Sequence, residues 1–259
     1  MLWRNGYRQA RICRMEARAG TTRRRYDSKY TVHDGRKFVY FVIQKVACTS
    51  VKTALLPLFD PDVAPFVATR MDGTQVVQVH KLFDRSNCQI GKGELLKGLD
   101  NKLSDYFEFT FVRNPWDRLV SCYSQKIVTV PKLLGFKRAN LNPPGEKDRF
   151  YPGMQFADFV EVVHATPDEE ANPHFRSQYL TVCDPEGRIM ADFVGRFENL
   201  FEEFVAVSQT IGAPELELPA HLQSHSRKSR PYTDFYDERL KGLVHERYQK
   251  DIEMFGYTY

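Results

Sequence analysis

Two stretches in which a buried strand passes directly into a helix constrain the fold of this chain most strongly. Residues 38–44 are a run of β-branched and aromatic side chains, and residues 107–112 are a second run of the same kind. Because almost every position in both runs is apolar, they are typical of strands buried on both faces, as in a parallel sheet. A helical pattern follows each run at once. The sequence therefore predicts an α/β fold, a three-layer, P-loop-like domain with a mainly parallel central sheet flanked by helices.

The first junction, residues 45–50, leads into a short helix. Apolar side chains recur at helical spacing on one face of it, at Val51, Ala54, Leu55 and Leu58. Thr49 or Ser50 is the expected N-cap of this helix.

The second junction carries a clearer helix start. Asn114 suits the N-cap, Pro115 suits the first helical position, and Asp117 stands where the acid of a capping box belongs. Arg118 and Ser121 fall on the predicted polar face of this helix. Both junctions are thus expected to present helix N-termini at the carboxyl edge of the sheet, where ligands bind in open α/β folds.

The rest of the chain shows a weaker alternation of strands and helices. Strands are predicted at 75–80 and 192–197, and helices at 94–103, 156–163, 201–211 and 234–255. Gly212 and Gly256 suit the ends of the last two helices. Residues 60–75 and 131–153 are expected to be loops.

Charge divides the chain of 259 residues into two parts. Residues 1–30 hold nine Lys or Arg residues against two acidic ones and are expected to form a basic, poorly ordered arm. Such an arm is able to make peripheral contact with an anionic membrane. Residues 31–259 are expected to form the folded domain. The net charge of +4 is too small to indicate a specific nucleic-acid partner.

Cysteine usage and hydropathy bear on the compartment. The five cysteines are scattered without a C-x-x-C pair, which favours reduced thiols over a disulfide framework. No stretch approaches the ~20 apolar residues of a membrane span, and the N-terminus lacks the apolar core of a signal peptide. We expect a cytoplasmic protein; its oligomeric state is left open.

The first junction is suited to bind an anion. Lys45 can reach over a group that the backbone amides of residues 47–50 hold, and the Thr49 and Ser50 hydroxyls can donate to it. Lys52 adds a cation in the first helical turn, where the helix dipole disfavours it unless an anion is near. The Walker pattern G-x-x-x-x-G-K-[ST] is absent. By itself, this turn is a weak signal and favours a capped helix with a solvated lysine.

The second junction adds an arginine at the end of a buried strand. Arg113 can hold a phosphate in bidentate fashion, with Ser121 two turns along the helix. The alternative is that Arg113 pairs with a neighbouring carboxylate such as Asp117. Two anion-ready turns in one sheet indicate a ligand with two separated anionic groups.

Several short segments, taken in order, resemble one enzyme family. They are residues 44–50, 111–123, 172–178, 193–200, 226–228 and 248–257. Together they resemble the Golgi carbohydrate sulfotransferases of the chondroitin 4-O, dermatan and HNK-1 group and their bacterial relatives. The likeness extends over roughly residues 38–257, and a bacterial-type soluble member is expected. Gln44 stands where that family commonly has proline, and Phe175 replaces the usual tryptophan.

The resemblance implies transfer of a sulfuryl group from 3′-phosphoadenosine 5′-phosphosulfate to a hydroxyl of a glycan or glycolipid acceptor. The loop for the 5′-phosphosulfate matches Lys45, Ala47, Cys48, Thr49 and Ser50. The 3′-phosphate motif matches Arg113 and Ser121, and Arg227 or Lys228 is expected to close over the nucleotide. We expect no metal requirement, because no cluster of metal-ligating residues stands out and the transferred group carries a single negative charge.

The acceptor hydroxyl needs a base, and three candidates remain open. We favour His80, because the family often places a histidine between its two nucleotide motifs. His174 is the second candidate and is expected chiefly to shape the acceptor side of the site. Glu198 is the third. Lys45 is the expected electrostatic catalyst, since it can stabilise the leaving phosphate oxygen.

Two other classes of function remain open. One is a nucleotide kinase with a degenerate phosphate loop, which would need a magnesium ligand after a strand. The other is a non-catalytic protein that binds nucleic acid or an anionic surface through residues 1–30. The sequence does not identify the acceptor.

Overall fold

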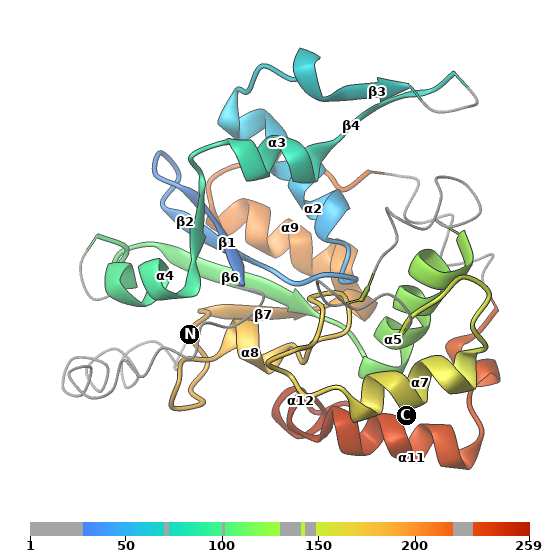
Figure 1. The fold of residues 1–259 in the computed structure, drawn as a ribbon. Coiled ribbons are helices and arrows are strands. Elements are labelled where there is room, and N and C mark those ends of the chain that lie inside the picture. The colour runs from blue at the N-terminus through green and yellow to red at the C-terminus, as the bar shows by residue number, and fades with distance from the viewer. Residues whose placement is uncertain (1–27, 70–72, 100–101, 130–140, 143–148, 220–229) are drawn as a thin grey trace.

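A five-stranded sheet lies at the centre of the protein (Figure 1). The computed structural model describes residues 28–69, 73–99, 102–129, 141–142, 149–219 and 230–259. In the order β5-β1-β2-β6-β7, the strands are β5 (Gln89–Gly91), β1 (Lys29–His33), β2 (Phe38–Val42), β6 (Phe107–Val112) and β7 (Phe193–Arg196). Strands β2, β6 and β7 run parallel, whereas β1 pairs antiparallel with β2 and β5. The predicted α/β fold is confirmed, with a mixed sheet whose parallel half holds both predicted junctions.

Strand β1 begins before the predicted start of the folded domain. Tyr30 is fully buried, and its hydroxyl donates to the carbonyl oxygen of Thr181 over 2.9 Å. The boundary predicted between residues 30 and 31 therefore falls inside β1. Residues 1–27 of the predicted basic arm lie outside the described residues.

Helices cover both faces of the sheet. The α-helices nearest to it are α2 (Cys48–Leu55), α4 (Lys92–Leu99), α8 (Tyr179–Val182) and α9 (Leu200–Thr210). Because side chains alternate along a strand, β2 sends Phe38 and Tyr40 into the core shared with α2 and α9. The same strand sends Val39 and Phe41 to the opposite face, where α4 covers them. This double burial explains the unbroken apolar run.

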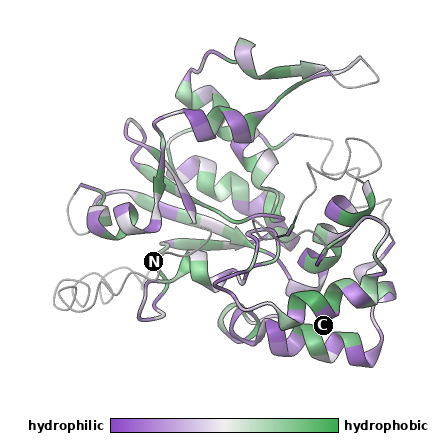
Figure 2. Ribbon diagram, viewed as in Figure 1, coloured by the Kyte–Doolittle hydropathy of each residue, from purple (hydrophilic) through white to green (hydrophobic). Residues whose placement is uncertain are grey.

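A second group of helices packs beside the sheet, at the end of β6 (Figure 1). It consists of α5 (Pro115–Tyr123), α7 (Phe156–Ala165), α11 (Glu238–Arg247) and α12 (Gln249–Phe255). Trp116, Phe159 and Tyr248 lie in its apolar core. Figure 2 shows apolar residues along the central strands and mixed polarity on the outer helices. Within the described ranges, no helix combines the length and apolar character needed to cross a bilayer.

A small hairpin stands apart from the central sheet (Figure 1). It pairs β3 (Val67–Thr69) with β4 (Gln75–Val77), and α3 (Val79–Arg85) follows it. The strand predicted at 75–80 is therefore too long, because the chain turns into a helix after Gln78. The predicted loop at 60–75 contains η3 (Ala64–Phe66) and β3.

The single C-terminal helix predicted at 234–255 is also wrong. It consists of the 3-10 helix η7 (Tyr232–Phe235) followed by α11 and α12. Tyr248 interrupts the two α-helices with φ −117° and ψ 23°. The helices predicted at 156–163 and 201–211 and the strand at 192–197 are confirmed as α7, α9 and β7. Gly212 and Gly256 have φ angles of 69° and 63°, as expected of helix ends.

The helix predicted at 94–103 is shorter than expected, since α4 ends at Leu99. Of the loop predicted at 131–153, only residues 141–142 and 149–153 belong to the described part of the chain.

Candidate active site

The turn between β2 and α2 has an unusual backbone. Lys45 and Ala47 have φ angles of 69° and 48°, in the left-handed region that non-glycine residues rarely adopt. Ala47, and not the predicted Thr49 or Ser50, is the N-cap of α2, and it makes no side-chain capping bond. Left-handed residues within such turns point backbone amides towards a common centre and create anion-binding concavities. Because strained backbone gathers at functional sites, this turn is the first part of the candidate site.

The Lys45 side chain lies against the segment that follows α5. Its Nζ atom donates to Gln125 Oε1 over 2.7 Å. Gln125 belongs to η4 (Ser124–Thr129), a π-helical turn, and such turns are frequent at functional sites. Burial lowers the pKa of Lys45 to about 8. A bound anion would favour the charged form again.

Arg113 joins the two junctions. Its Nη1 atom donates to the carbonyl oxygen of Lys45 over 3.1 Å. Its Nε atom donates to Asp117 Oδ2 over 2.8 Å, so the pairing considered as an alternative is present as well. The guanidinium carbon lies 4.0 Å from the centre of the Phe197 ring. The Gln178 side-chain amide brackets the Arg113 backbone, with hydrogen bonds of 3.0 and 2.9 Å to its N–H and C=O groups.

The predicted start of α5 is largely confirmed. Asn114 Oδ1 accepts a hydrogen bond from the Trp116 amide over 3.0 Å, and Pro115 is the first helical residue. The predicted capping box is wrong, because Asp117 pairs with Arg113. The Asn114 amide instead donates to Glu198 Oε1 over 2.8 Å.

Glu198 has a structural place at this junction. In addition to the Asn114 amide, it accepts a hydrogen bond from the Tyr257 hydroxyl over 3.1 Å at its second oxygen. Both carboxylate oxygens are thus engaged, and this favours the two histidines over Glu198 as base candidates.

Arg118 is buried rather than on a solvated polar face, and its exposed fraction is only 3%. Its guanidinium donates to three carbonyl oxygens, those of Gln44, Arg176 and Pro173, over 3.0, 2.8 and 3.2 Å. It therefore ties the β2–α2 turn to the 172–178 segment. This role was not predicted from the sequence, since helical periodicity does not reveal that carbonyl groups will line a helix face.

Ser121 lies half-buried two turns beyond Asn114 on α5. Within the described part of the chain, no hydrogen bond joins its side chain to Arg113. Arg227 and Lys228 lie outside the described residues.

His80 lies next to the first junction. It sits in the first turn of α3, where Nε2 is 2.9 Å from Thr49 Oγ1 and 3.9 Å from Cys48 Sγ. Burial, and then the positive charge of Lys52, lowers the pKa of His80 to about 4. The imidazole is therefore neutral near pH 7.

His174 belongs to the same group of side chains. Its Nδ1 atom lies 2.7 Å from Asn172 Oδ1. Burial, followed by the positive charges of Lys126 and Lys45, holds the pKa of His174 well below its ordinary value. Pro173, directly before His174, accepts a hydrogen bond from the Arg118 guanidinium that also bonds Gln44, directly before Lys45. The structure thus places both predicted histidines near the turn that carries Lys45.

The structure places two lysines near the site differently from the sequence prediction. Lys52 is buried, with an exposed fraction of 1%, and its Nζ lies 5.1 Å from the centre of the Phe83 ring. It therefore packs between helices rather than at the open turn. Lys126 in η4 was not predicted as a site residue, yet its positive charge acts on Lys45, His80 and His174. The π-helical turn that brings Gln125 and Lys126 here has no clear sequence signal.

The Tyr248-x-x-Asp251 element anchors the 172–179 segment. Asp251 is fully buried and accepts hydrogen bonds from the amides of Gln178 and Tyr179, both over 2.8 Å. The Tyr248 hydroxyl donates to the carbonyl oxygen of Phe175 over 2.5 Å. Burial raises the pKa of Asp251 to about 6. This element therefore supports the loop that carries His174.

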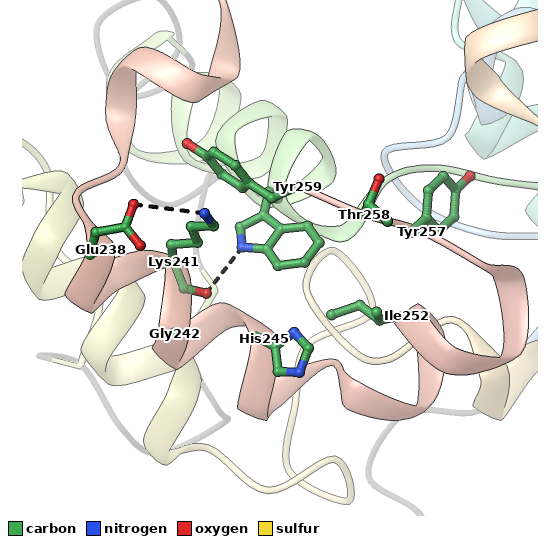
Figure 3. A pocket seen from close by; sticks show the side chains of 9 residues that line it. Glu238, Lys241, Gly242, His245, Ile252, Tyr257, Thr258 and Tyr259 are labelled. Carbon is green, nitrogen blue, oxygen red and sulfur yellow. Dashed lines mark hydrogen bonds and ion pairs between the residues drawn. The ribbon is translucent and has the colours of Figure 1, made fainter.

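A cavity of about 400 Å³ lies between α5, α11 and the last residues of the chain (Figure 3). Trp116 lines it, with its indole N–H donating to the Lys241 carbonyl oxygen over 3.1 Å. His245 and Tyr259 are also part of the wall. None of the predicted site residues lines this cavity, so it is separate from the group around Lys45. Among the described residues, no group of three or more His, Cys, Asp or Glu side chains is arranged to hold a metal ion.

The described residues form an α/β domain in which two strand-to-helix junctions meet at the end of two parallel strands. The chain belongs to the sulfotransferase family, whose sequence model matches residues 28–258. This match begins one residue before β1 and includes every described element of the fold.

The chain is similar to several named members of that family. It is 26% identical to carbohydrate sulfotransferase 11 of Mus musculus over 248 residues, or 90% of this chain and 68% of the relative. It is 27% identical to carbohydrate sulfotransferase 8 of Mus musculus, over 93% of this chain and 60% of the relative. It is 26% identical to carbohydrate sulfotransferase 9 of Homo sapiens, over 89% of this chain and 53% of the relative. The chain thus spans between about half and two thirds of the length of these relatives. No solved structure matches it.

Proposed function

We propose that this protein transfers the sulfuryl group of 3′-phosphoadenosine 5′-phosphosulfate to a hydroxyl group of a carbohydrate acceptor. The observation that supports this most directly is the hydrogen bond between Arg113 Nη1 and the Lys45 carbonyl oxygen. It holds the two anion-ready junctions side by side, so that one nucleotide is able to contact both of them. The carbohydrate acceptor rests on the names of the relatives.

The two junctions divide the donor between them in this proposal. Lys45, Thr49 and the amides at the start of α2 bind the 5′-phosphosulfate, because helix N-termini offer unpaired N–H groups. Arg113 binds the 3′-phosphate with the part of its guanidinium that faces neither Asp117 nor Lys45. Ser121, Arg227 and Lys228 remain proposed partners of the nucleotide on the basis of the family pattern.

The chemistry is electrostatic, as in phosphoryl transfer, with little covalent work for the protein. The acceptor oxygen forms a bond to sulfur while the bond from sulfur to the 5′-phosphate oxygen breaks. Lys45 stabilises the negative charge that develops on that leaving oxygen. A neutral histidine of the site takes the hydroxyl proton, which typically contributes about 10²–10⁴ in rate.

Thermal unfolding with added nucleotides tests the donor assignment. In the absence of Mg²⁺, adenosine 3′,5′-bisphosphate is expected to raise the melting temperature far more than ATP does. At 100 times Kd a ligand stabilises its protein by about 2.7 kcal/mol. Equal responses to the two nucleotides would support the kinase alternative, and no response to either would contradict the proposal.

The binder alternative is tested by removing the basic segment. The deletion should cover residues 1–27 and leave β1 intact, because Tyr30 is part of the core. The proposal predicts unchanged bisphosphate affinity in this variant. An acceptor screen with radiolabelled donor, using unsulfated chondroitin, unsulfated heparan and a neutral N-glycan, then tests the carbohydrate class.

A further inference from the structure

His174 is held by a side chain that has no role in the function proposed above. Asn172 precedes it by two residues and has an exposed fraction of 8%. Asn172 Oδ1 accepts a hydrogen bond from the backbone amide of His174 over 3.2 Å and lies 2.7 Å from the Nδ1 atom of the same residue. Both contacts converge on one oxygen atom.

These two contacts determine which ring nitrogen of His174 carries the proton. A backbone N–H group only donates, so the Asn172 atom that it meets is the amide oxygen and not the amide nitrogen. An amide oxygen only accepts, so Nδ1 of His174 must be the protonated nitrogen. The lone pair of a neutral imidazole then lies on Nε2.

The surroundings of His174 keep the ring neutral. The charged and titratable groups that act on it are Lys126 from η4, Lys45 from the β2–α2 turn, Arg118 from α5 and His80 from α3. Burial is the main cause of the lowered pKa, because it disfavours the imidazolium, and these groups add to it since all of them carry or can acquire positive charge. The ring is therefore a free base near pH 7.

His80 has the opposite arrangement. Its Nε2 atom forms a hydrogen bond of 2.9 Å with Thr49 Oγ1. Thr49 lies in the first turn of α2, the helix that follows the proposed anion-binding turn. His80 is thus engaged with the donor side of the site, whereas the unprotonated nitrogen of His174 is not used by Asn172.

We propose that His174 Nε2 is the catalytic base and that Asn172 is the positioning residue that fixes its tautomer. This inference rests on the proposed function. The proton of the acceptor hydroxyl moves to Nε2, and the freed oxygen electron pair forms the bond to sulfur. The bond from sulfur to the 5′-phosphate oxygen breaks, and its electron pair leaves with adenosine 3′,5′-bisphosphate. The imidazolium returns its proton to solvent, with Nδ1 bonded to Asn172 throughout.

Long-range ¹H–¹⁵N NMR of the ligand-free full chain tests the tautomer without any substrate. The wild-type protein should show His174 protonated at Nδ1 alone, and Asn172→Ala should give a mixture of tautomers. Asn142→Ala is the matched control, since Asn142 is a buried asparagine that bonds the backbone of Phe150. Protonation of His174 at Nε2 in the wild-type protein would overturn the inference.

Kinetics test the catalytic role, with the acceptors of the screen described above. His174→Ala should lower kcat by about 10²–10⁴ while the Kd for adenosine 3′,5′-bisphosphate stays within about twofold. Asn172→Ala should lower kcat in the same sense. Asn172→Asp keeps an acceptor at Nδ1 and should recover most of the activity, with the acid limb of the pH profile moved upward.

Two outcomes separate this inference from the proposed function. If the wild-type protein and His174→Ala bind bisphosphate equally and transfer sulfate equally, the base assignment fails and the proposed function stands. If the wild-type protein binds no bisphosphate, the proposed function itself fails. An Asn172→Ala variant no worse than Asn142→Ala would remove Asn172 from the mechanism.

Discussion

Arg113 Nη1 donates a hydrogen bond to the carbonyl oxygen of Lys45 over 3.1 Å, and this bond connects the ends of two adjacent parallel strands. The carbonyl that accepts it belongs to a residue with left-handed backbone. Arg113 therefore helps to hold the strained turn in the conformation that exposes its amides. Arg113, which the family pattern links to the 3′-phosphate, thus also supports the turn proposed to bind the 5′-phosphosulfate.

This double role predicts a large effect of Arg113→Ala. Hydrogen bonds to charged groups contribute about 1.5–3 kcal/mol, so the Kd for adenosine 3′,5′-bisphosphate should rise by at least about tenfold. Isothermal titration calorimetry measures it. Arg188→Ala is the matched control, because Arg188 also pairs with an acid four residues away, Asp184, but outside the two junctions. Equal affinity of the two variants would contradict the assignment of Arg113.

Lys45 should take up a proton when the bisphosphate binds. Its pKa is about 8 in the ligand-free protein, so it is about half charged at pH 8, and an adjacent anion favours full protonation. The affinity for the bisphosphate is therefore highest below pH 8, where Lys45 is charged, and it weakens as the pH rises above that value. Calorimetry in buffers of different ionisation enthalpy should give an uptake of about half a proton at pH 8.

The uptake should vanish in Lys45→Ala and persist in Lys37→Ala, whose lysine pairs with Asp105 on the surface. Turnover of Lys45→Ala should fall strongly with the fold intact, because transition-state charge stabilisation is lost. An unchanged proton uptake in Lys45→Ala would assign it to another group.

Gln125→Glu provides an independent measure of the contact with Lys45. A carboxylate in place of the amide oxygen, 2.7 Å from Nζ, would raise the pKa of Lys45. Proton uptake at pH 8 should then disappear, and bisphosphate affinity should fall because the negative charge faces the anion. Gln249→Glu, a surface glutamine that bonds Glu253, is the control. A proton uptake in Gln125→Glu equal to that of the wild-type protein would show that Lys45 does not form its hydrogen bond with Gln125 in solution.

The positions of both junctions were predictable because their signals are local, although the N-cap of α2 was not. An apolar run followed by a cap residue and proline identifies β6 and the start of α5 without tertiary information. The burial of Arg118 was not predictable, because its partners are carbonyl groups of Gln44, Pro173 and Arg176 that the fold brings in from elsewhere.

The same limit applies to two other elements. The alternation at Gln75–His80 is too short to separate a strand from the helix that follows it. The C-terminal helix is interrupted at Tyr248, whose side chain turns inward to reach the Phe175 carbonyl oxygen. Phe175 is far from Tyr248 in the sequence, so the residues near Tyr248 do not reveal this interruption.

His80 should titrate far below the ordinary histidine range. Burial and the charge of Lys52 place its pKa at about 4 in the folded protein, against 6.5 for an exposed histidine. Protonation therefore favours the unfolded chain: the stability linked to His80 is present above pH 6.5 and is lost as the pH falls from there towards about 4. NMR titration of the ring Cε1–H, assigned with His80→Asn, measures the midpoint. A midpoint near 6.5 would mean that the ring is not buried against Thr49.

The stability linked to Asp251 should depend on pH in the opposite direction to the stability linked to His80. Its pKa is raised to about 6 by burial, above the unfolded value of 3.8, so folding favours its protonated form. The stability linked to this proton is present below pH 3.8 and is lost as the pH rises through about 6. Removal of the side chain also leaves the Gln178 and Tyr179 amides buried without an acceptor, at about 1–3 kcal/mol each.

Urea denaturation of Asp251→Ala and the wild-type protein at pH 5 and pH 7.5 tests both effects, because the titration of His80 cancels between two proteins compared at one pH. The wild-type advantage should exceed about 2 kcal/mol and be larger at pH 5. Asp237→Ala is the control, since it removes the exposed N-cap of α11 and should cost about 0.5–2 kcal/mol without this pH dependence. If the two variants lose equal stability at both pH values, Asp251 does not hold the 172–179 loop. The position of His174 would then have to come from Arg118 and its bonds to the same loop.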